Sequence, residues 1–419
     1  MIHLRVGLAT FSMAIALALA NAAVAQTAGP RFRADGRDAD AYGRKEGYPA
    51  CRTIEYAAKQ ACRIGAFSHF DSLFPSRTIA APKASSRLGR APTEPTIRYS
   101  YLGQNLTLDN YLESQPITGF LIAKGDTILL ERYQYGRTDK QRLTSFSMAK
   151  TITAMLISIA VKEGLIKDIR DPAEVYAPEL KGTEYGRTPI RALLQMSSGI
   201  AFKEEYGDPN SDISILYRGT LGQEAGGSPV VLKRFNNRVT PPSQRWSYAS
   251  AETSVLGLVL AGATKRNISD YAREKLWQPL GAEADAKWSV DATGREVTYA
   301  YFNATLRDWA RLGLMLAHDG TWNGNAIVPR EWLLAATTIA PSDTHLKFAQ
   351  SYWAGYGYQV WLIPGSRRMF ALQGFRGQFV MVDAETKVVL VQTAARAGSD
   401  AAADKELLAI FQAASSQLR

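Results

Sequence analysis

The sequence of 419 residues contains only four histidines and two cysteines. His3 lies in the first 25 residues, and His69, His318 and His345 stand in loop-like surroundings without a convincing acidic partner. Because the chain also has no G-x-S-x-G motif, we do not expect a histidine-dependent catalytic triad. It has no H-x-x-x-H motif and no His/Cys cluster either, so we expect no metal site.

Signatures for binding phosphate groups and nucleic acids are also absent. The chain has no G-x-x-x-x-G-K motif, and no G-x-G-x-x-G motif follows a predicted strand. The formal net charge is +10, but the basic residues alternate with acids and form no block of five or more. We therefore expect no cofactor and no nucleic-acid partner, and we interpret the charge as a general surface property suited to an anionic envelope.

Long apolar runs are absent after the first 25 residues, and these residues resemble a secretory signal. Arg5 precedes the mostly apolar stretch Val6–Ala20, and Ala23-Val24-Ala25 forms a small-x-small cleavage site. This order predicts cleavage after Ala25, a periplasmic or secreted protein, and no stable membrane insertion afterwards. The alternative is a retained membrane anchor, for which the run is short and interrupted by Thr10 and Ser12.

The two cysteines, Cys51 and Cys62, lie within one segment with ten residues between them. In an exported protein such an isolated pair predicts a disulfide, here one that closes a small loop in an N-terminal extension at residues 26–100. Two free thiols or a metal pair are the alternatives, and His69 is the sole further ligand in the neighbourhood. We expect the extension, rich in Arg, Ala, Ser and Pro, to be irregular and to wrap around the main domain.

The pattern from residue 101 to 419 predicts one domain with strands at both ends. Strands are expected at 117–123 and 127–135 and again at 356–363, 368–373, 378–383 and 388–393. Residues 165–345 have a helix-and-loop pattern, with helices at 189–196, 252–263, 269–276, 305–317 and 329–337, and further helices at 107–113 and 401–418. The expected fold class is α/β of the α+β type: an antiparallel sheet from both chain ends, flanked by helices, with a large helical insertion and a cleft between sheet and insertion.

The segment Ser145-Phe146-Ser147-Met148-Ala149-Lys150 opens an apolar helix that ends near Gly164. A spacing of three places Ser147 and Lys150 on one helix face, with Cβ atoms about 5–6 Å apart. A lysine that sheds its charge can accept the serine proton, which makes the serine a nucleophile. This spacing of serine and lysine occurs once in the chain. The alternative is a solvated N-cap serine beside a surface lysine.

A Ser–Lys nucleophile needs a proton donor for the leaving group, and a tyrosine can fill this role. Tyr248-Ala249-Ser250 precedes the apolar helix at 252–263 and follows Pro241-Pro242 and Trp246, which would fix the loop. Tyr301 is a rival of similar form, but Thr305 after it has the pattern of a helix cap, so we favour Tyr248. For both residues the alternative is a packed tyrosine with a satisfied hydroxyl.

Acyl transfer also needs N–H donors for the oxyanion. Ser147 can supply one. The segment Gln373-Gly374-Phe375-Arg376-Gly377 interrupts the C-terminal strands, and its glycines permit close backbone approach, so Phe375 is the candidate for the second donor. A plain bulge or turn is the alternative.

Three motifs follow one another in the order found in a known family of hydrolases: Ser147-Met148-Ala149-Lys150, Tyr248-Ala249-Ser250 and the glycine segment at Gly374. Over roughly residues 110–415 the chain resembles the penicillin-recognising serine hydrolases: class C β-lactamases, DD-peptidases, family VIII carboxylesterases and 6-aminohexanoate-dimer hydrolases. The stretch R-A-L-L-Q-M-S-S-G that ends at Gly199 adds to this likeness. The resemblance implies a β-lactamase/transpeptidase-like fold and a catalytic set of Ser147, Lys150 and Tyr248, with Ser250 orienting the last two and with Ser147 and Phe375 holding the oxyanion.

The departures from the family pattern concern substrate choice. Ser250 replaces the asparagine of Y-x-N, and Gln373 stands where K-T-G or H-x-G places a cation. These departures are more similar to the 6-aminohexanoate-dimer hydrolase and esterase branch, so we expect an exported hydrolase of a small amide or ester. β-Lactamase or DD-peptidase activity would need Arg376 to supply the cation, and a non-catalytic binding or sensor module is a further alternative. The acidic loop at 203–212 could favour an amino-terminated substrate or be merely solvated.

Overall fold

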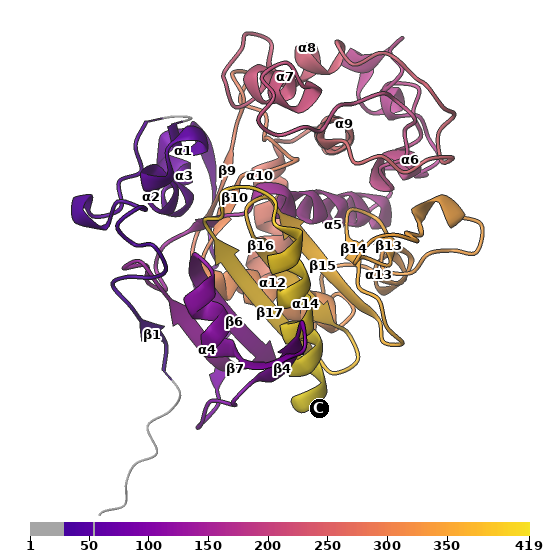
Figure 1. Ribbon diagram of the computed structural model, residues 1–419. Coiled ribbons are helices and arrows are strands. Elements are labelled where there is room, and N and C mark those ends of the chain that lie inside the picture. Colours follow the sequence, from indigo (N-terminus) through magenta and orange to yellow (C-terminus); the bar gives the residue numbers. More distant parts are fainter. Residues whose placement is uncertain (1–28, 53–54) are drawn as a thin grey trace, which may run out of the picture.

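A computed structural model describes residues 29–52 and 55–419, and its largest element is a nine-stranded sheet (Figure 1). The strand order is β1-β7-β6-β17-β16-β15-β14-β13, with β3 also paired to β7. The strands are β1 Arg31–Phe32, β3 Gly89–Arg90, β6 Ile117–Lys124, β7 Thr127–Tyr133, β13 Gly355–Tyr356, β14 Trp361–Leu362, β15 Met369–Gly374, β16 Gln378–Asp383 and β17 Val388–Ala394. Antiparallel pairing of β6 with β17 joins the two ends of the domain, which confirms the predicted fold class.

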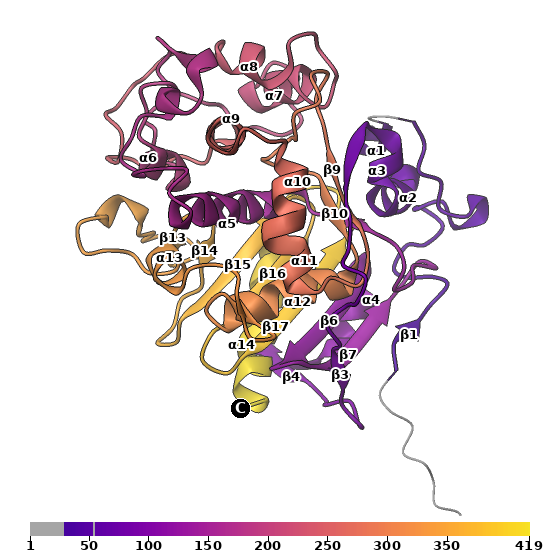
Figure 2. The ribbon, with the colours of Figure 1, turned by 180° about the vertical axis from the view of Figure 1, so that it is seen from behind.

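Both faces of the central strands are buried, and alternate residues enter two separate cores. On β6, Leu121 and Ala123 belong to one core, whereas Phe120 and Ile122 belong to the other. This explains why these strands are continuously apolar rather than alternating. Helix α12 (Leu306–Ala317) covers the first face and helix α14 (Ala401–Gln417) the second, as Figures 1 and 2 show from opposite sides.

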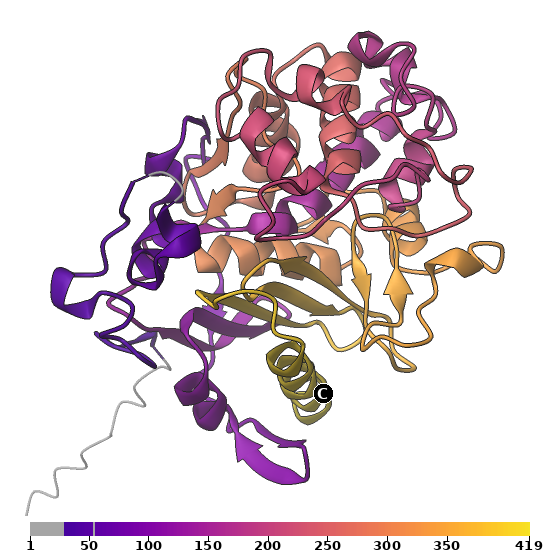
Figure 3. The same ribbon diagram turned by 45° about the horizontal axis from the view of Figure 1, so that its top comes forward.

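The insertion between β7 and β13 is mainly helical. Its first part, from α5 to α9, lies beyond one end of the sheet (Figure 3), whereas α12 lies on one face. The principal helix of the insertion, α5, is buried over most of its length. Helix α4 Leu108–Ser114 precedes the insertion. The insertion contains η3 Phe146–Met148, α5 Ala149–Lys162, α6 Ile190–Leu194, α7 Asp212–Gly219, α8 Gly227–Leu232, α9 Ser250–Thr264, α10 Ile268–Ala272, the π-helical turn η6 Arg273–Trp277, α11 Gln278–Leu280 and α13 Arg330–Ala336.

Smaller sheets occur in the insertion and in the extension, and the sequence patterns did not predict them. Four short strands pair in the order β2-β9-β10-β8, namely β2 Ser76–Ile79, β9 Ala286–Ser289, β10 Phe302–Ala304 and β8 Leu143–Thr144. Two-stranded ladders join β4 Arg98–Tyr101 to β5 Gln104–Thr107 and β11 Thr321–Trp322 to β12 Asn325–Ala326. Strands of two to four residues are too short to produce a recognisable period of two.

The strand predicted at 356–363 is wrong. Two short strands, β13 and β14, form a hairpin there, because the chain turns at Gln359, whose φ is 58°. The buried Gln359 side chain donates to the carbonyls of Leu193 and Leu194 in α6 and accepts from Thr253 in α9. These hydrogen bonds to two helices stabilise the turn more than a continuous strand over residues 356–363 would be stabilised by pairing.

The N-terminal extension is more regular than predicted. It contains helices α1 Glu55–Ala58, α2 Arg63–Ser68 and α3 Phe70–Leu73. Its strands join the nine-stranded and the four-stranded sheet: β1 and β3 pair in parallel with β7, and β2 pairs with β9. The extension is therefore an integral part of the fold, and the expectation that it is irregular is wrong.

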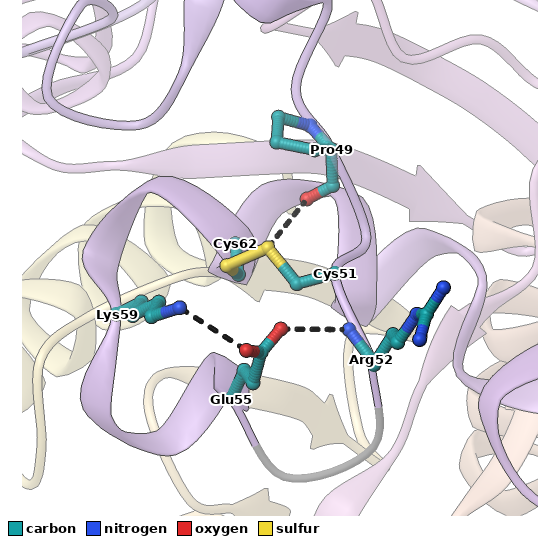
Figure 4. Close-up of a disulfide and its surroundings, with 6 residues drawn as sticks. All are labelled: Pro49, Cys51, Arg52, Glu55, Lys59 and Cys62. Carbon is teal, nitrogen blue, oxygen red and sulfur yellow. Dashed lines mark hydrogen bonds and ion pairs between the residues drawn. A yellow bond between two sulfur atoms is a disulfide. The ribbon is translucent and has the colours of Figure 1, made fainter.

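The predicted disulfide between Cys51 and Cys62 is confirmed (Figure 4). Within the described residues, Cys51, Glu55 and Cys62 are the one group that brings three possible metal ligands together, but both sulfurs are bound to each other. The predicted signal peptide lies at positions outside the described residues. Among the helices of residues 29–52 and 55–419, none has the length and apolar character needed to cross a bilayer.

Candidate active site

Ser147 lies in the 3₁₀ turn η3, which leads directly into α5 at the end of the sheet. The Lys150 ammonium donates to Ser147 Oγ at 2.9 Å and to the carbonyl of Tyr299 at 2.9 Å. Lys150 is 1% exposed, whereas Ser147 is only partly buried and lines a cleft. The alternative of a surface lysine beside a solvated serine is therefore excluded.

Burial determines the charge of Lys150. Removal from water penalises the ammonium form and lowers the pKa of Lys150 to about 7, although the nearby charge of Glu204 acts in the opposite direction. The Nζ atom lies 5.1 Å from the ring centroid of Tyr248 and 5.6 Å from that of Tyr299. A substantial neutral fraction near pH 7 can accept a proton from Ser147 across the existing hydrogen bond.

Tyr248 faces the same cleft as Ser147, and the chain after α6 holds it there. The N–H of Ser247 donates to the carbonyl of Met196, and the N–H of Ala249 donates to the sulfur of Met196. The Tyr248 ring stacks on Trp361 with centroids 5.7 Å apart. Burial, with the charge of Glu204, raises the pKa of Tyr248, so its phenol is protonated at neutral pH, and contact with Ser147 offsets part of this effect.

Tyr301, the rival candidate, lies in the aromatic core. It is 6% exposed, has φ of 64°, and stacks on Phe70 with centroids 4.7 Å apart. Tyr301 does not line the cleft, and its ring is not one of the two that lie near the Lys150 ammonium. The geometry therefore favours Tyr248.

Ser250 begins α9, and its contacts reveal a neighbour that the sequence patterns did not single out. The Ser250 hydroxyl donates to Glu204 Oε1 at 2.6 Å, and its N–H donates to Glu204 Oε2 at 2.8 Å. Tyr206 donates to Glu204 Oε1 at 2.7 Å and stacks on Phe375, with centroids 4.3 Å apart. Glu204 thus fastens the acidic loop to the segment that carries Tyr248. Nothing local in that loop distinguished Glu204 from its acidic neighbours.

The end of β15 brings Gly374 and Phe375 to the Ser147 turn. A Cβ atom on Gly374 would lie 2.2 Å from the carbonyl oxygen of Ser145, so only glycine allows this approach. Gly374 and Phe375 line the cleft together with Ser147. This placement is the one required of a strand edge that supplies an oxyanion donor.

We expect Gly374→Ala to lower kcat/KM for a p-nitrophenyl ester by about 10²-fold or more, the scale of losing one oxyanion donor. The added methyl group must push β15 away from the backbone of Ser145. Gly398→Ala is the matched control, because Gly398 lines the same cleft and a Cβ atom there would meet nothing within 4 Å. Equal activities of the two variants would contradict this role for Gly374.

The cleft that contains these groups has a volume of about 890 Å³. Much of its wall is aromatic, with Tyr206, Trp246, Phe348, Trp353, Trp361 and Phe375 among the lining residues. Its charged lining residues include the acids Glu204, Asp400 and Asp404 and the cations Lys347, Arg376 and Arg396. The cleft is therefore suited to a small molecule with apolar parts.

Arg376 does not present a free cation to the nucleophile. It is 7% exposed, and its guanidinium donates to the carbonyls of Arg396 at 3.2 Å and Ala57 at 3.3 Å. Burial and the nearby charge of Arg63 lower the pKa of Arg376 to about 10. Gln373, which carries no charge, donates to Asp404.

Comparison with known proteins identifies relatives of this fold and sequence. The family model described as Beta-lactamase matches residues 108–415. The 6-aminohexanoate-dimer hydrolase of Paenarthrobacter ureafaciens is 28% identical over 339 residues, in an alignment that covers 78% of this chain and 84% of that protein.

Solved structures agree with this assignment at the level of the fold. A Bacillus anthracis protein with a provisional assignment as a 6-aminohexanoate-dimer hydrolase superposes with a TM-score of 0.76 at 21% identity, over 85% of this chain and 94% of its own. A family VIII carboxylesterase superposes with a TM-score of 0.53 at 17% identity over 71% of this chain and 93% of its own.

Proposed function

The chain belongs to the beta-lactamase family, and from this premise we propose that it is an exported serine hydrolase that cleaves an amide or ester through an acyl-enzyme. One observation carries the proposal: the buried Lys150, with its pKa lowered to about 7, donates to Ser147 Oγ at 2.9 Å. The named relatives in this family are hydrolases.

In the proposed acylation step, Ser147 Oγ attacks the substrate carbonyl carbon while neutral Lys150 accepts the hydroxyl proton. The N–H groups of Ser147 and Phe375 stabilise the oxyanion of the tetrahedral intermediate. The bond to the leaving nitrogen or oxygen then breaks, and Tyr248 donates a proton to that atom. Its raised pKa suits this role, because the phenol is protonated when the intermediate forms.

Deacylation reverses these transfers with water in place of the leaving group. Water attacks the acyl carbon, its proton passes to the Tyr248–Lys150 pair, and the carbon–Oγ bond breaks as Ser147 recovers a proton. Ser250 supports Tyr248 indirectly, since it and Glu204 fix the start of α9 and the loop before it.

Export is proposed from residues 1–25 as a signal peptide cleaved after Ala25, which gives a periplasmic or secreted protein. The disulfide between Cys51 and Cys62 supports an oxidising compartment. We further propose that residues 26–100 are an extension and residues 101–419 the hydrolase domain.

For the substrate we propose a small linear amide or ester rather than a β-lactam. The 6-aminohexanoate-dimer hydrolase relative supports an amide. The aromatic wall suits an aliphatic chain, and Glu204 near the nucleophile suits a substrate that is not anionic there. A β-lactam or a D-Ala-D-Ala peptide presents a carboxylate, for which Gln373 and the buried Arg376 supply no free cation.

The test combines trapping with a substrate panel. The mature protein, residues 26–419, is incubated with a fluorophosphonate, and intact mass and peptide mapping locate the adduct. The 6-aminohexanoate linear dimer, a p-nitrophenyl ester and a fluorescent penicillin are then compared as substrates. We expect one adduct, on Ser147, turnover of the ester and the dimer, and acylation by penicillin at least about 10²-fold slower than by the ester, the scale on which a site rejects a poorly matched substrate.

Each contrary result has a definite meaning. An adduct on another serine would overturn the assignment of Ser147. The absence of both adduct and turnover would favour a non-catalytic binding module. Rapid penicillin acylation that is lost in Arg376→Ala would support the β-lactamase or DD-peptidase alternative.

A further inference from the structure

Two residues beside the proposed oxyanion donors have an unfavourable backbone conformation. Phe146, which precedes Ser147, has φ of 43°, and Arg376, which follows Phe375, has φ of 66°. Bulky residues rarely adopt positive φ, and such a conformation costs about 1–3 kcal/mol unless the surroundings enforce it. Both positions must therefore be held by contacts elsewhere in the molecule.

Two aromatic rings of the N-terminal extension contact Phe146, and the rings of Tyr301 and Phe375 contact it as well. The Phe146 ring packs edge-to-face on Phe67 of α2 with centroids 5.0 Å apart, and lies 6.3 Å from Phe70 of α3. On its other side lies Phe375, with centroids 6.1 Å apart. Rotating Phe146 to an ordinary φ would remove its ring from this aromatic cluster.

The same extension contacts Arg376. Its guanidinium donates to the carbonyl of Ala57 in α1, inside the loop that the disulfide closes. Tyr56, the neighbour of Ala57, packs edge-to-face on Phe67 and Phe70, with centroids 5.8 and 5.6 Å apart. One short segment thus reaches both strained positions.

The disulfide connects the two halves of this segment. Cys62 is 2% exposed and directly precedes α2, which carries Phe67, while Cys51 lies before α1. Figure 4 shows Glu55 beside the bond, where it accepts from Lys59 and from the N–H of Arg52 and completes the loop. The loop is closed locally, so breaking the bond frees this segment without cutting the main sheet.

We propose that residues 55–70, which the disulfide joins to Cys51, are a positioning element of the catalytic site. They hold Phe146 and Arg376 in their left-handed conformations and thereby aim the N–H groups of Ser147 and Phe375 at the oxyanion. The proposal rests on the proposed function, since it assigns a role within that same site. Phe67 is its central positioning residue, and reduction of the disulfide lowers turnover without removing any catalytic group.

The test compares Phe67→Ala, Phe67→Leu and the double variant Cys51→Ser/Cys62→Ser with wild type. We expect Phe67→Ala and the double variant to lower kcat for a p-nitrophenyl ester by about 10- to 100-fold, less than the complete loss of one oxyanion donor. KM should stay within about threefold. Affinity for a trifluoromethyl ketone, whose adduct carries an oxyanion, should fall in parallel with kcat/KM. Phe67→Leu, which keeps apolar volume, should recover most of the activity.

Reduction of the folded wild-type protein provides a second measurement that requires no variant to fold. A phosphine reductant should lower kcat as the double variant does, reoxidation should restore it, and the double variant should not respond. Phe411→Ala is the matched control, because Phe411 is a fully buried phenylalanine of α14 in the other core. It should lower the melting temperature and leave kcat unchanged.

The proposal is overturned if Phe67→Ala and the reduced protein keep kcat within twofold of wild type, or if ketone affinity stays constant while kcat falls. It is also overturned if Phe411→Ala lowers kcat equally, because loss of stability alone would then explain the effect. Failure of the proposed function is separate: in that case the wild-type protein would show no Ser147 adduct under any of these conditions.

Discussion

Ser147→Ala is expected to lower kcat for amide and ester substrates by on the order of 10⁴- to 10⁶-fold, the scale on which serine hydrolases lose activity without their nucleophile. Alanine leaves Lys150 in place but removes the only atom that can form the acyl-enzyme. The remaining activity would come from substrate binding and the oxyanion donors acting on water. KM should change little, since the hydroxyl contributes little to ground-state binding.

The measurement is steady-state hydrolysis of a p-nitrophenyl ester together with intact mass after exposure to a fluorophosphonate. Ser158→Ala is the matched control, because Ser158 is a buried serine of the same helix whose hydroxyl donates to the carbonyl of Met155. It should keep kcat within a few fold of wild type and should still form the adduct. Retention of more than about 1% of wild-type kcat by Ser147→Ala would refute the nucleophile.

The closeness of Ser147 and Lys150 could be predicted because its geometry is local. A spacing of three on a helix places Ser147 and Lys150 together whatever surrounds the helix. The central strands β6, β16 and β17 were likewise predictable from continuous apolar sequence. The short strands β8, β9 and β10 were not, because pairing with distant segments and not an internal pattern creates them.

The features of the site that the sequence patterns did not predict depend on contacts between distant segments. The bonds from Ser250 to Glu204 join positions 46 residues apart, and nothing in either segment encodes the partner. The conformation of Phe146 is imposed by Phe67 and Phe375, which approach from opposite ends of the chain. A Ser–Lys motif thus predicts which two side chains meet, whereas the groups packed around them are known only from the assembled fold.

Lys150→Met is expected to lower kcat by about 10⁴-fold, since no other neutral amine can accept the Ser147 proton. In the wild-type protein, kcat/KM should fall as the pH falls through about 7, where Lys150 becomes protonated. The variant should lose this acid limb along with its activity. Lys162→Met, at the other end of α5, is the control and should keep both.

The same substitution should stabilise the protein. The ordinary lysine pKa of 10.5 falls to about 7 on folding, so the charged form is disfavoured in the native state. Below pH 7 this penalty is fully present, and it disappears as the pH rises to about 10.5, because in that window the unfolded chain binds a proton that the folded chain does not. The corresponding cost is on the order of 5 kcal/mol, at 1.36 kcal/mol for each pKa unit.

Methionine removes this cost but leaves the Tyr299 carbonyl without the lysine donor, which costs about 1–3 kcal/mol. We therefore expect Lys150→Met to raise the free energy of unfolding by on the order of 2–4 kcal/mol at pH 6. Urea titrations of both proteins from pH 6 to pH 10 would measure the difference, which should shrink as the pH rises. A variant that is less stable than wild type at pH 6, or a difference that grows with pH, would show that burial does not lower the pKa of Lys150.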